Sequence, residues 1–226
     1  NVKGALAALR EQGTEVILVG RGEEILKVLN EEGMQEPPAG MEIVHASEVV
    51  EICDNPATAF REKKDSSLTV GLNLLKDGKG DAFVSAGSTG ALLAAATLLV
   101  KRIKGIRRAA MAPVVPTAQG GAVLIDCGAT AECTPEYLLQ FAFMGSYYAE
   151  HVLGRPEPRV GLLNIGAEPS KGTELQQRTY QLLKEAGDQG RIHFVGNVEG
   201  KEAVYGAADV IVSDGYSGNI FLKTME

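Results

Sequence analysis

The stretch "RVGLLNIGAEPSKGTELQQRTYQLLKEA" (159–186) decides the fold class of this chain. It opens with an almost unbroken apolar run (159–166), which is typical of a strand buried on both faces of a parallel sheet. A polar, glycine-containing turn follows, and from Thr173 onward the apolar residues recur with helical spacing. A buried strand, a turn and a helix in this order form one unit of a βα architecture.

The same pattern recurs along the chain and predicts an α/β fold. We predict strands at 15–20, 41–46, 81–87, 121–128, 159–166, 192–197 and 209–215. Between them we predict helices over 23–33, 57–77, 90–104, 135–153, 173–186 and 200–207. The chain also starts and stops in helical sequence, and no linker is long enough to force a domain boundary. We therefore expect one α/β domain over 1–226.

Composition narrows the function classes. The 226 residues carry a net charge of −7 and only 5% aromatic residues, with no tryptophan, which argues against a nucleic-acid binder. The three cysteines form no CxxC pair, which favours a reducing cytoplasm over a disulfide scaffold. The three histidines have no metal-ligand spacing, so we expect no metal site. We also expect no cofactor. The apolar run 91–100 is only half of the roughly 20 residues that span a bilayer, and no secretion signal opens the chain.

Four predicted strand ends share one kind of turn, which combines glycine with hydroxyl, carboxylate or amide side chains. They are "SAGSTGA" (85–91), "DCGATAEC" (126–133), "NIGAEPSKGTE" (164–174) and "SDGYSGN" (213–219). Parallel sheets bind ligands at the carboxyl ends of strands, where helix amides favour anions. For any single turn, capping and tight packing explain the residues better, but four together favour a phosphate-bearing ligand. There is no P-loop and no GxGxxG motif, so ATP and NAD are unsupported.

Single residues in these turns have a chemical and a structural interpretation. Asp126 and Asp214 end apolar strands, where each can act as a base or cap the next turn. Lys171 can pair with phosphate or be a solvated loop charge. Cys127 is better explained as a small buried residue than as a nucleophile. "REKKDSSL" (61–68) is a solvated helix face, or a clamp if an anion binds nearby.

Five segments in order resemble the bacterial phosphate acyltransferase family of phospholipid synthesis. They are "REKKDSSL" (61–68), "DAFVSAGSTGAL" (81–92), "FAFMGSYYAE" (141–150), "RVGLLNIGAEPSKG" (159–172) and "DVIVSDGYSGNIFLKTME" (209–226). Ser88 and Thr130 stand where the family usually has asparagine, and Tyr216 and Ser217 where it usually has phenylalanine and threonine. We expect the family's first strand and its C-terminal portion to lie outside this chain.

The resemblance implies a Rossmann-like three-layer α/β/α fold with a mostly parallel sheet, similar to phosphate acetyltransferases and the isocitrate dehydrogenase-like fold. It implies a homodimer that transfers a long-chain acyl group from acyl carrier protein to inorganic phosphate. A downstream membrane acyltransferase then uses the acyl phosphate. The implied location is the cytoplasm, with peripheral association at the inner face of the membrane as a further expectation.

This reaction needs orientation, an oxyanion donor and neutralisation of charge, and it needs no enzyme nucleophile. We expect phosphate to bind at Ser88, Thr89 and Gly90, with further contacts from Lys63, Lys64 and Ser66. The candidate catalytic residues are two amide donors, two possible bases and one cation: Asn164, Asn219, Asp126, Asp214 and Lys171. The basic run of Lys101, Arg102, Lys104, Arg107 and Arg108 suits docking of an acidic carrier protein, and solvation of a helix end explains it equally well.

Three other functions stay open. The first is a phosphate acetyltransferase-like enzyme that uses a small acyl-CoA. The second is a dehydrogenase on the related fold, although the sequence shows no carboxylate cluster for its metal. The third is a module that binds the carrier protein without catalysis. Phosphate-dependent thiol release from acyl carrier protein, measured in parallel with a small acyl-CoA, distinguishes them.

Overall fold

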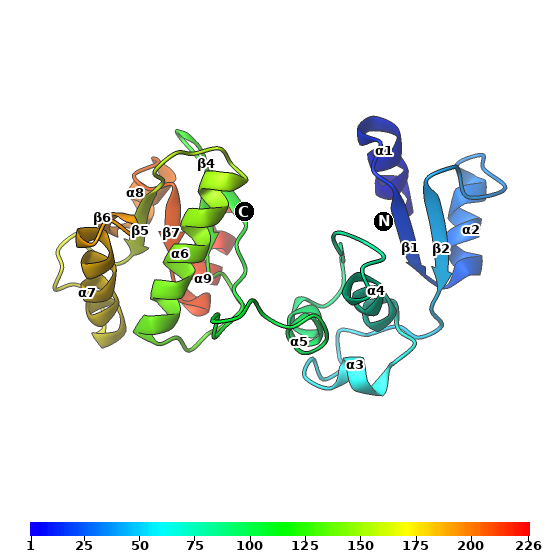
Figure 1. The fold of residues 1–226 in the computed structure, drawn as a ribbon, viewed down its shortest axis with the longest axis horizontal. Coiled ribbons are helices and arrows are strands. Elements are labelled where there is room, and N and C mark those ends of the chain that lie inside the picture. The colour runs from blue at the N-terminus through cyan, green and yellow to red at the C-terminus, as the bar shows by residue number, and fades with distance from the viewer. The chain divides into compact units, whose positions relative to one another are not determined.

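The computed structural model describes residues 1–226, which divide into two compact units, Asn1–Arg102 and Ile103–Glu226 (Figure 1). The expected single domain over the whole chain stays a prediction. The first unit contains a two-stranded parallel sheet of β1 (Val16–Gly20) and β2 (Met41–His45). Its helices are α1 (Val2–Gln12), α2 (Gly22–Glu31), α3 (Ala59–Glu62), α4 (Ser67–Lys76) and α5 (Thr89–Leu99).

The first unit differs from the sequence prediction in two places. The predicted helix over 57–77 is interrupted, because Lys63 ends α3 and the extended Ser66 caps α4. The predicted strand over 81–87 is wrong, since this segment pairs with no strand. Only Phe83 packs inward, against Gly71, and Val84 is 92% exposed. An apolar run becomes a strand only where a neighbouring strand takes up its backbone hydrogen bonds, and in this unit the segment has no such neighbour.

The second unit is a three-layer α/β structure built on a five-stranded sheet in the order β3-β4-β7-β5-β6. The strands are β3 (Val114–Thr117), β4 (Gly120–Ile125), β5 (Arg159–Leu163), β6 (His193–Val198) and β7 (Val210–Val212). Strand β3 is antiparallel to β4 at one edge, and the other four strands are parallel. The helices are α6 (Pro135–His151), α7 (Glu174–Asp188), α8 (Gly200–Val204) and α9 (Gly215–Met225). The predicted α/β class with a mostly parallel sheet is therefore confirmed.

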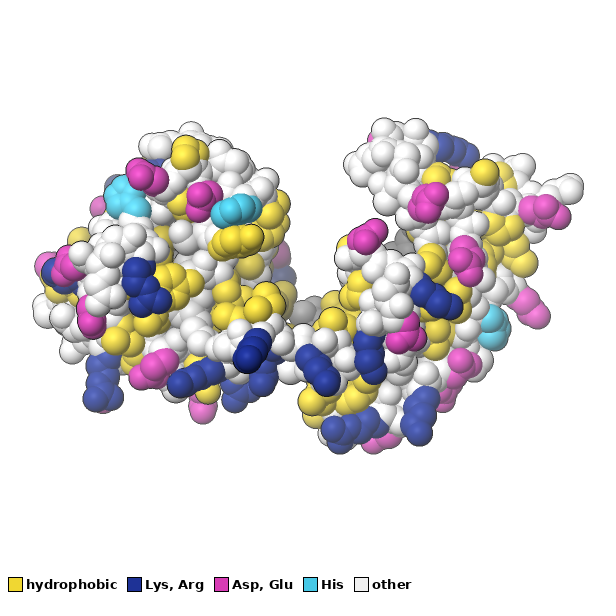
Figure 2. All heavy atoms as spheres, in the orientation of Figure 1, with side chains coloured by type: hydrophobic (Ala, Val, Ile, Leu, Met, Phe, Trp, Pro, Cys, Tyr) yellow, Lys and Arg dark blue, Asp and Glu magenta, His cyan; other side chains and the backbone are white.

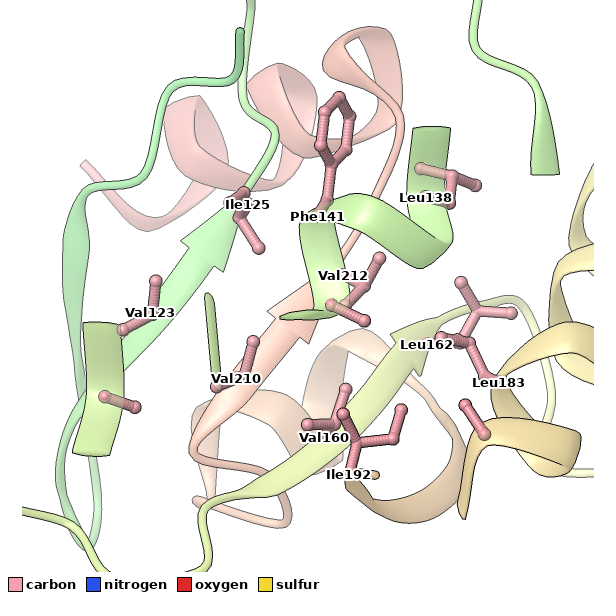
Figure 3. Packing of buried hydrophobic residues seen from close by; sticks show 13 residues of the cluster. Val123, Ile125, Leu138, Phe141, Val160, Leu162, Leu183, Ile192, Val210 and Val212 are labelled. Carbon is pink, nitrogen blue, oxygen red and sulfur yellow. The ribbon is translucent and has the colours of Figure 1, made fainter. Parts of the chain in front are cut away.

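Both faces of this sheet are buried, as its apolar strands predict. On one face, Val123, Ile125, Val210 and Val212 belong to one buried cluster with side chains of α6 and α7, in which Phe141 of α6 is fully buried (Figure 3). The alternate strand residues form a second cluster on the other face with α8 and α9; its buried members are Val115, Ala122, Leu124, Cys127, Val198, Ala203, Ala208 and Ile211. Burying one such aliphatic side chain contributes about 1.5–3 kcal/mol, so the two layers hold the strand ends in fixed positions.

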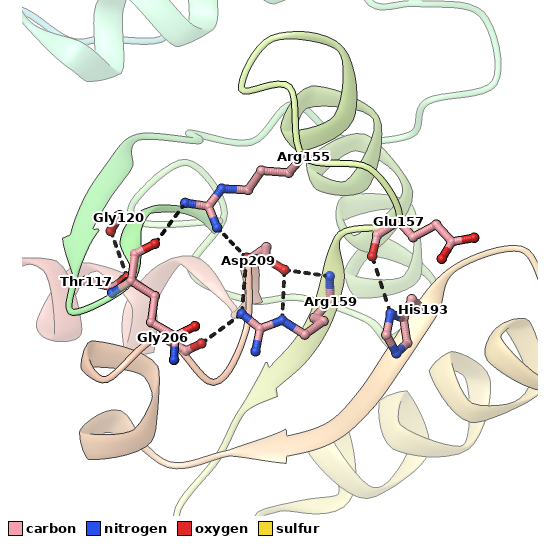
Figure 4. Close-up of polar contacts among 9 residues, drawn as sticks. Thr117, Gly120, Arg155, Glu157, Arg159, His193, Gly206 and Asp209 are labelled. Carbon is pink, nitrogen blue, oxygen red and sulfur yellow. Dashed lines mark hydrogen bonds and ion pairs between the residues drawn. The ribbon is translucent and has the colours of Figure 1, made fainter.

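A polar network closes the amino ends of β5 and β7 (Figure 4). Asp209, immediately before β7, accepts hydrogen bonds from the guanidinium groups of Arg155 and Arg159 and from the Arg159 backbone N–H. The same guanidinium groups also donate to the carbonyl oxygens of Gln119 and Gly206. The network thus ties β7 to β5 and to the loop before β4, at the edge opposite the predicted turns.

Candidate functional site

Three of the four predicted turns lie at one edge of the second unit's sheet. The predicted turns at 126–133, 164–174 and 213–219 begin directly after β4, β5 and β7. These strands are parallel, so their carboxyl ends share this edge. The register pairs Leu162 with Val212, so Asn164 and Asp214 each follow a paired residue by two positions at the carboxyl ends of neighbouring strands. The structure therefore brings all five candidate catalytic residues, Asp126, Asn164, Lys171, Asp214 and Asn219, to this edge.

Asp126 is fully buried and anchors the turn after β4. Its Oδ1 accepts backbone N–H groups of Met111, Cys127 and Ala129 at 2.9, 2.7 and 3.1 Å, and its Oδ2 accepts that of Thr130 at 2.7 Å. Because both oxygens of this carboxylate already accept backbone N–H groups, the side chain stabilises the loop. Of the two interpretations of Asp126, the geometry supports the structural one.

Asp214 is the N-cap of α9, where its Oδ1 accepts the Ser217 N–H at 2.8 Å. The helix then packs tightly on the turn after β4. A Cβ on Gly218 would lie 1.9 Å from the Asp126 carbonyl oxygen, and one on Gly215 would lie 2.7 Å from the Thr130 carbonyl oxygen. From the sequence, we expect these glycines to let a ligand approach the backbone. In the structure they let one segment of backbone approach another.

Asn219 makes fewer hydrogen bonds within the protein than the other carboxylate and amide side chains of this group. It is exposed in the second turn of α9, and its Oδ1 lies 3.8 Å from where a Cβ on Gly128 would stand. Its side-chain amide takes part in no hydrogen bond within the protein. Asn219 can therefore donate a hydrogen bond to a group bound over the turns after β4 and β7.

Asn164 and Lys171 belong to the turn after β5. Asn164 accepts the Ile165 N–H at 2.8 Å and donates to the Lys171 carbonyl at 3.2 Å, so its amide holds the two ends of the turn together. The Lys171 side chain is exposed, and its Cγ lies 2.8 Å from where a Cβ on Gly166 would stand. The lysine stem thus lies across the turn at the sheet edge.

The six candidate phosphate-binding residues lie in the first unit. Ser88 caps α5 by accepting the Ala91 N–H, and Thr89 and Gly90 form the first turn of that helix. Lys63 donates to Asp54 at 2.5 Å and to the Val49 carbonyl at 2.7 Å. The hydrogen bond and charge of Asp54 raise the pKa of Lys63.

The other two members of this group differ in exposure. Ser66 is fully buried and caps α4 through Thr69, which makes it a structural residue. Lys64 is exposed and takes part in no ion pair. Its ammonium is therefore free to meet an anion from solvent.

The five predicted docking residues are exposed and lie on both sides of the boundary at 102/103. In the second unit, the Arg107 N–H donates to Gln140, and the Arg108 guanidinium lies 5.7 Å from the centre of the Tyr137 ring. Both contacts fix the basic segment to the first turns of α6. On the visible face of this unit, Lys and Arg side chains gather along the lower edge of the view (Figure 2).

The thiols near the site are poor nucleophiles. Burial and the neighbouring Asp126 raise the pKa of Cys127 to about 11. Burial also raises the pKa of Cys133 to about 11. A thiol with this pKa is almost entirely protonated at neutral pH, so neither Cys127 nor Cys133 is suited to act as a nucleophile.

Two residues that the sequence does not single out, Gln177 and Asn197, both contact the turn after β5. Gln177 Nε2 donates to the Ser170 carbonyl and Asn197 Nδ2 to the Glu168 carbonyl, each at 2.8 Å. Neither lies in a strand-end turn, so no local signal distinguishes them. The pairing of Leu162 with Asn197 near the ends of β5 and β6 places Asn197 next to the turn after β5.

Two solved structures, a phosphotransacetylase and a branched-chain phosphotransacylase, have a similar fold. A phosphotransacetylase from Streptococcus pyogenes superposes with a TM-score of 0.74 at 19% sequence identity, covering 98% of this chain and 76% of that one. A branched-chain phosphotransacylase from Enterococcus faecalis V583 gives a TM-score of 0.52 at 17% identity, covering 92% and 83%. At these identities the likeness defines the fold alone.

Sequence comparison then identifies the family. The model of the family described as fatty acid synthesis protein matches residues 1–226, and the chain belongs to that family. A protein of Desulfitobacterium hafniense named phosphate acyltransferase is 52% identical over 226 residues, all of this chain and 66% of that protein. One of Heliobacterium modesticaldum with the same name is 50% identical over 222 residues, 98% of this chain and 65% of that protein. The chain thus spans about two thirds of the length of these relatives. Separately, the structure contains no helix with the length and hydrophobicity that a bilayer-spanning segment requires.

Proposed function

We propose that the protein transfers a long-chain acyl group from acyl carrier protein to inorganic phosphate, giving acyl phosphate for phospholipid synthesis. The observation that carries this proposal is the match of the whole chain to the fatty acid synthesis protein family, together with relatives of about 50% identity named phosphate acyltransferase. The proposal extends to a cytoplasmic homodimer, peripheral at the membrane, whose product a membrane acyltransferase consumes.

The reaction is balanced without a nucleophile from the protein. A phosphate oxygen forms a bond to the thioester carbonyl carbon, the carbon–sulfur bond breaks, and the proton of hydrogen phosphate goes to the departing thiolate. The protein has to neutralise the phosphate, orient it and stabilise the oxyanion that forms. Lys171 supplies positive charge, and Asn219 supplies an uncommitted amide donor at the same sheet edge. In the first unit, Ser88, Thr89, Gly90 and Lys64 are candidates for phosphate contacts.

The acyl donor is an acidic carrier protein in this proposal. The exposed basic residues Lys104, Arg107 and Arg108 offer charge complementarity, which raises the rate of encounter and fixes orientation. Lys101 and Arg102 precede them in the chain and extend the same basic segment. We expect docking to weaken with rising salt because the exposed charges are screened.

The test uses the intact protein with long-chain acyl carrier protein, with and without inorganic phosphate. Free thiol is followed, and acyl phosphate is trapped as the hydroxamate with hydroxylamine. Lys171→Ala is expected to lower kcat/KM for phosphate at least ~10-fold through loss of a charge-assisted contact. The matched control is Lys201→Ala, an exposed lysine of α8.

Each result leads to a definite conclusion. Phosphate-dependent thiol release with a trapped hydroxamate supports the proposal. Activity with small acyl-CoA alone favours a phosphate acetyltransferase-like enzyme, and carrier-protein binding without thiol release favours a binding module. Equal activity of Lys171→Ala and Lys201→Ala removes Lys171 from the mechanism.

A further inference from the structure

Side-chain amides hold the turn after β5 by its carbonyl groups. Between Glu168 and Gly172, four of the five carbonyl oxygens accept such an amide. Asn197 Nδ2 donates to the Glu168 oxygen at 2.8 Å. Gln177 Nε2 donates to the Ser170 oxygen at 2.8 Å and to the Gly172 oxygen at 3.3 Å. Asn164 Nδ2 donates to the Lys171 oxygen at 3.2 Å. We name these three residues, Asn164, Gln177 and Asn197, the amide clamp.

The amide clamp draws on three separate elements. Asn164 follows β5, Gln177 lies in the first turns of α7, and Asn197 is in β6. Asn197 is only 7% exposed, and its Oδ1 has no hydrogen-bond partner. Keeping a buried amide with one unsatisfied oxygen costs stability, so packing alone does not explain it. The hydrogen bond from Asn197 Nδ2 to the Glu168 carbonyl oxygen explains why an amide stands at this position.

Lys171 lies within the clamped segment, between Ser170 and Gly172. The carbonyls on both sides of it, of Ser170 and Gly172, bind one side chain, Gln177. Gly172 has φ +85°, and a Cβ there would lie 2.6 Å from Asn164 Oδ1, so the segment closes only with glycine. The backbone that carries Lys171 is thus fixed on both sides, which reduces the conformational freedom a loop lysine loses when it contacts a ligand.

We propose that Gln177 and Asn197 are positioning residues, which hold Lys171 at the sheet edge so that its ammonium meets inorganic phosphate. This inference rests on the proposed function, since it assigns phosphate as the group that Lys171 contacts. Neither positioning residue touches phosphate. Both act through the backbone of residues 168–172.

The test replaces Gln177 with methionine in the intact protein. Methionine keeps the length, volume and charge of the side chain and removes both hydrogen bonds to the loop. Gln177 and Gln181 are both exposed on α7, so Gln181→Met is a matched control that leaves the loop intact. Asn197→Leu repeats the measurement from β6 with a side chain of similar size.

Two readouts separate the clamp from the reaction. Hydrogen exchange of peptides covering 165–173 is expected to become about 3- to 10-fold faster in Gln177→Met and to stay unchanged in Gln181→Met, because two neutral hydrogen bonds are lost. The KM for phosphate is expected to rise about 3- to 10-fold, with kcat and the KM for the acyl donor within ~2-fold of the wild type. In a Lys171→Ala background, Gln177→Met is expected to add less than ~2-fold, since the two residues act as one unit.

Unchanged exchange in Gln177→Met overturns the clamp. Faster exchange with an unchanged phosphate KM, or an effect that persists in full without Lys171, overturns the positioning role. If the wild-type protein forms no acyl phosphate, the proposed function fails by itself. Equilibrium titration with inorganic phosphate then decides the inference: weaker binding by Gln177→Met than by Gln181→Met supports it, and equal binding overturns it.

Discussion

Replacing Asp209 with asparagine removes the only carboxylate of the network at the amino ends of β5 and β7. Asp209 is 7% exposed and accepts four hydrogen bonds. One comes from Arg155 Nη1 at 2.6 Å, and three come from the backbone N–H, Nε and Nη2 of Arg159 at 2.9, 3.0 and 3.2 Å. In Asp209→Asn, an NH₂ group faces some of these donors, and two guanidinium groups lose their shared counter-charge.

The expected cost is about 3 kcal/mol. Breaking a buried ion pair by removing one partner costs about 3–5 kcal/mol, because the remaining charge is left uncompensated. Here the side chains of Arg155 and Arg159 are 29% and 33% exposed, so water relieves part of the cost. Their bonds to the carbonyls of Gln119 and Gly206 also remain. A loss of about 3 kcal/mol corresponds to a more than ~100-fold increase in the population that opens.

The pH dependence has a definite sign. Burial raises the pKa of Asp209, but the hydrogen bonds and charges of Arg159 and Arg155 outweigh burial, and the pKa falls below its ordinary value of 3.8. The folded carboxylate therefore keeps its charge to a lower pH than the unfolded one. Its stabilisation is complete above the unfolded pKa and is lost as pH falls through the folded pKa. The difference between wild type and Asp209→Asn should be constant from about pH 5 to pH 8 and should shrink below about pH 4.

Native-state hydrogen exchange of peptides from β5 and β7 measures this difference in the unit concerned, without assuming that the two units unfold together. The matched control is Asp188→Asn, which breaks the exposed Lys184–Asp188 pair of α7 and should cost no more than about 0.5 kcal/mol. A loss below about 1 kcal/mol in Asp209→Asn, or one equal to the control, refutes the reasoning. So does a difference that widens on acidification below pH 4.

Three further outcomes are expected. Gly218→Ala should cost at least ~2 kcal/mol in thermal or urea unfolding, because its Cβ would lie 1.9 Å from the Asp126 carbonyl oxygen; near-wild-type stability would show that α9 can shift. Asp126→Asn should destabilise by about 2–4 kcal/mol, since an NH₂ would face a backbone N–H; lost activity at unchanged stability would instead return Asp126 to the chemistry. At pH 8, iodoacetamide should modify the exposed Cys53 in the native protein, and Cys127 and Cys133 only after unfolding, which mass spectrometry of the peptides can check.

The sequence predicts this fold well wherever a strand is buried on both faces. The apolar runs that contain β4, β5 and β7 need no alternation to be identified, because helices cover both sides. Strand β3 was missed, since it is an antiparallel edge with an exposed Val114 and a proline at 116. The run at 81–87 has the composition of a strand, but a strand forms only where a neighbouring strand pairs with it. Composition does not show whether such a neighbour is present.

The sequence predicts that the polar strand-end residues lie close together, but not which contacts each of them makes. Asp126, Asn164 and Asp214 follow parallel strands and lie at one sheet edge, as the strand ends followed by glycine and polar residues predict. Whether a carboxylate serves a ligand or its own loop depends on the donors that surround it. The Met111 N–H reaches Asp126 from 15 residues away, and Asn197 reaches Glu168 from 29 residues away. Contacts at such separations are set by packing of the sheet, and no local pattern encodes them.

The two ends of the parallel strands separate stability from chemistry. Asp209 and Asp214 flank the short strand β7, yet one binds two arginines at the amino end and the other caps a helix at the carboxyl end. The hydrophobic layers between them are rigid, so loss of the arginine network should weaken the unit as a whole before it displaces the turn after β5. Asp209→Asn should therefore lower the stability of the unit and leave the phosphate KM unchanged. Gln177→Met should raise the phosphate KM and leave the stability of the unit unchanged. If both variants changed both quantities, the two ends would be coupled through the sheet, and the positions of Lys171 and Asn219 would depend on the arginine network as well.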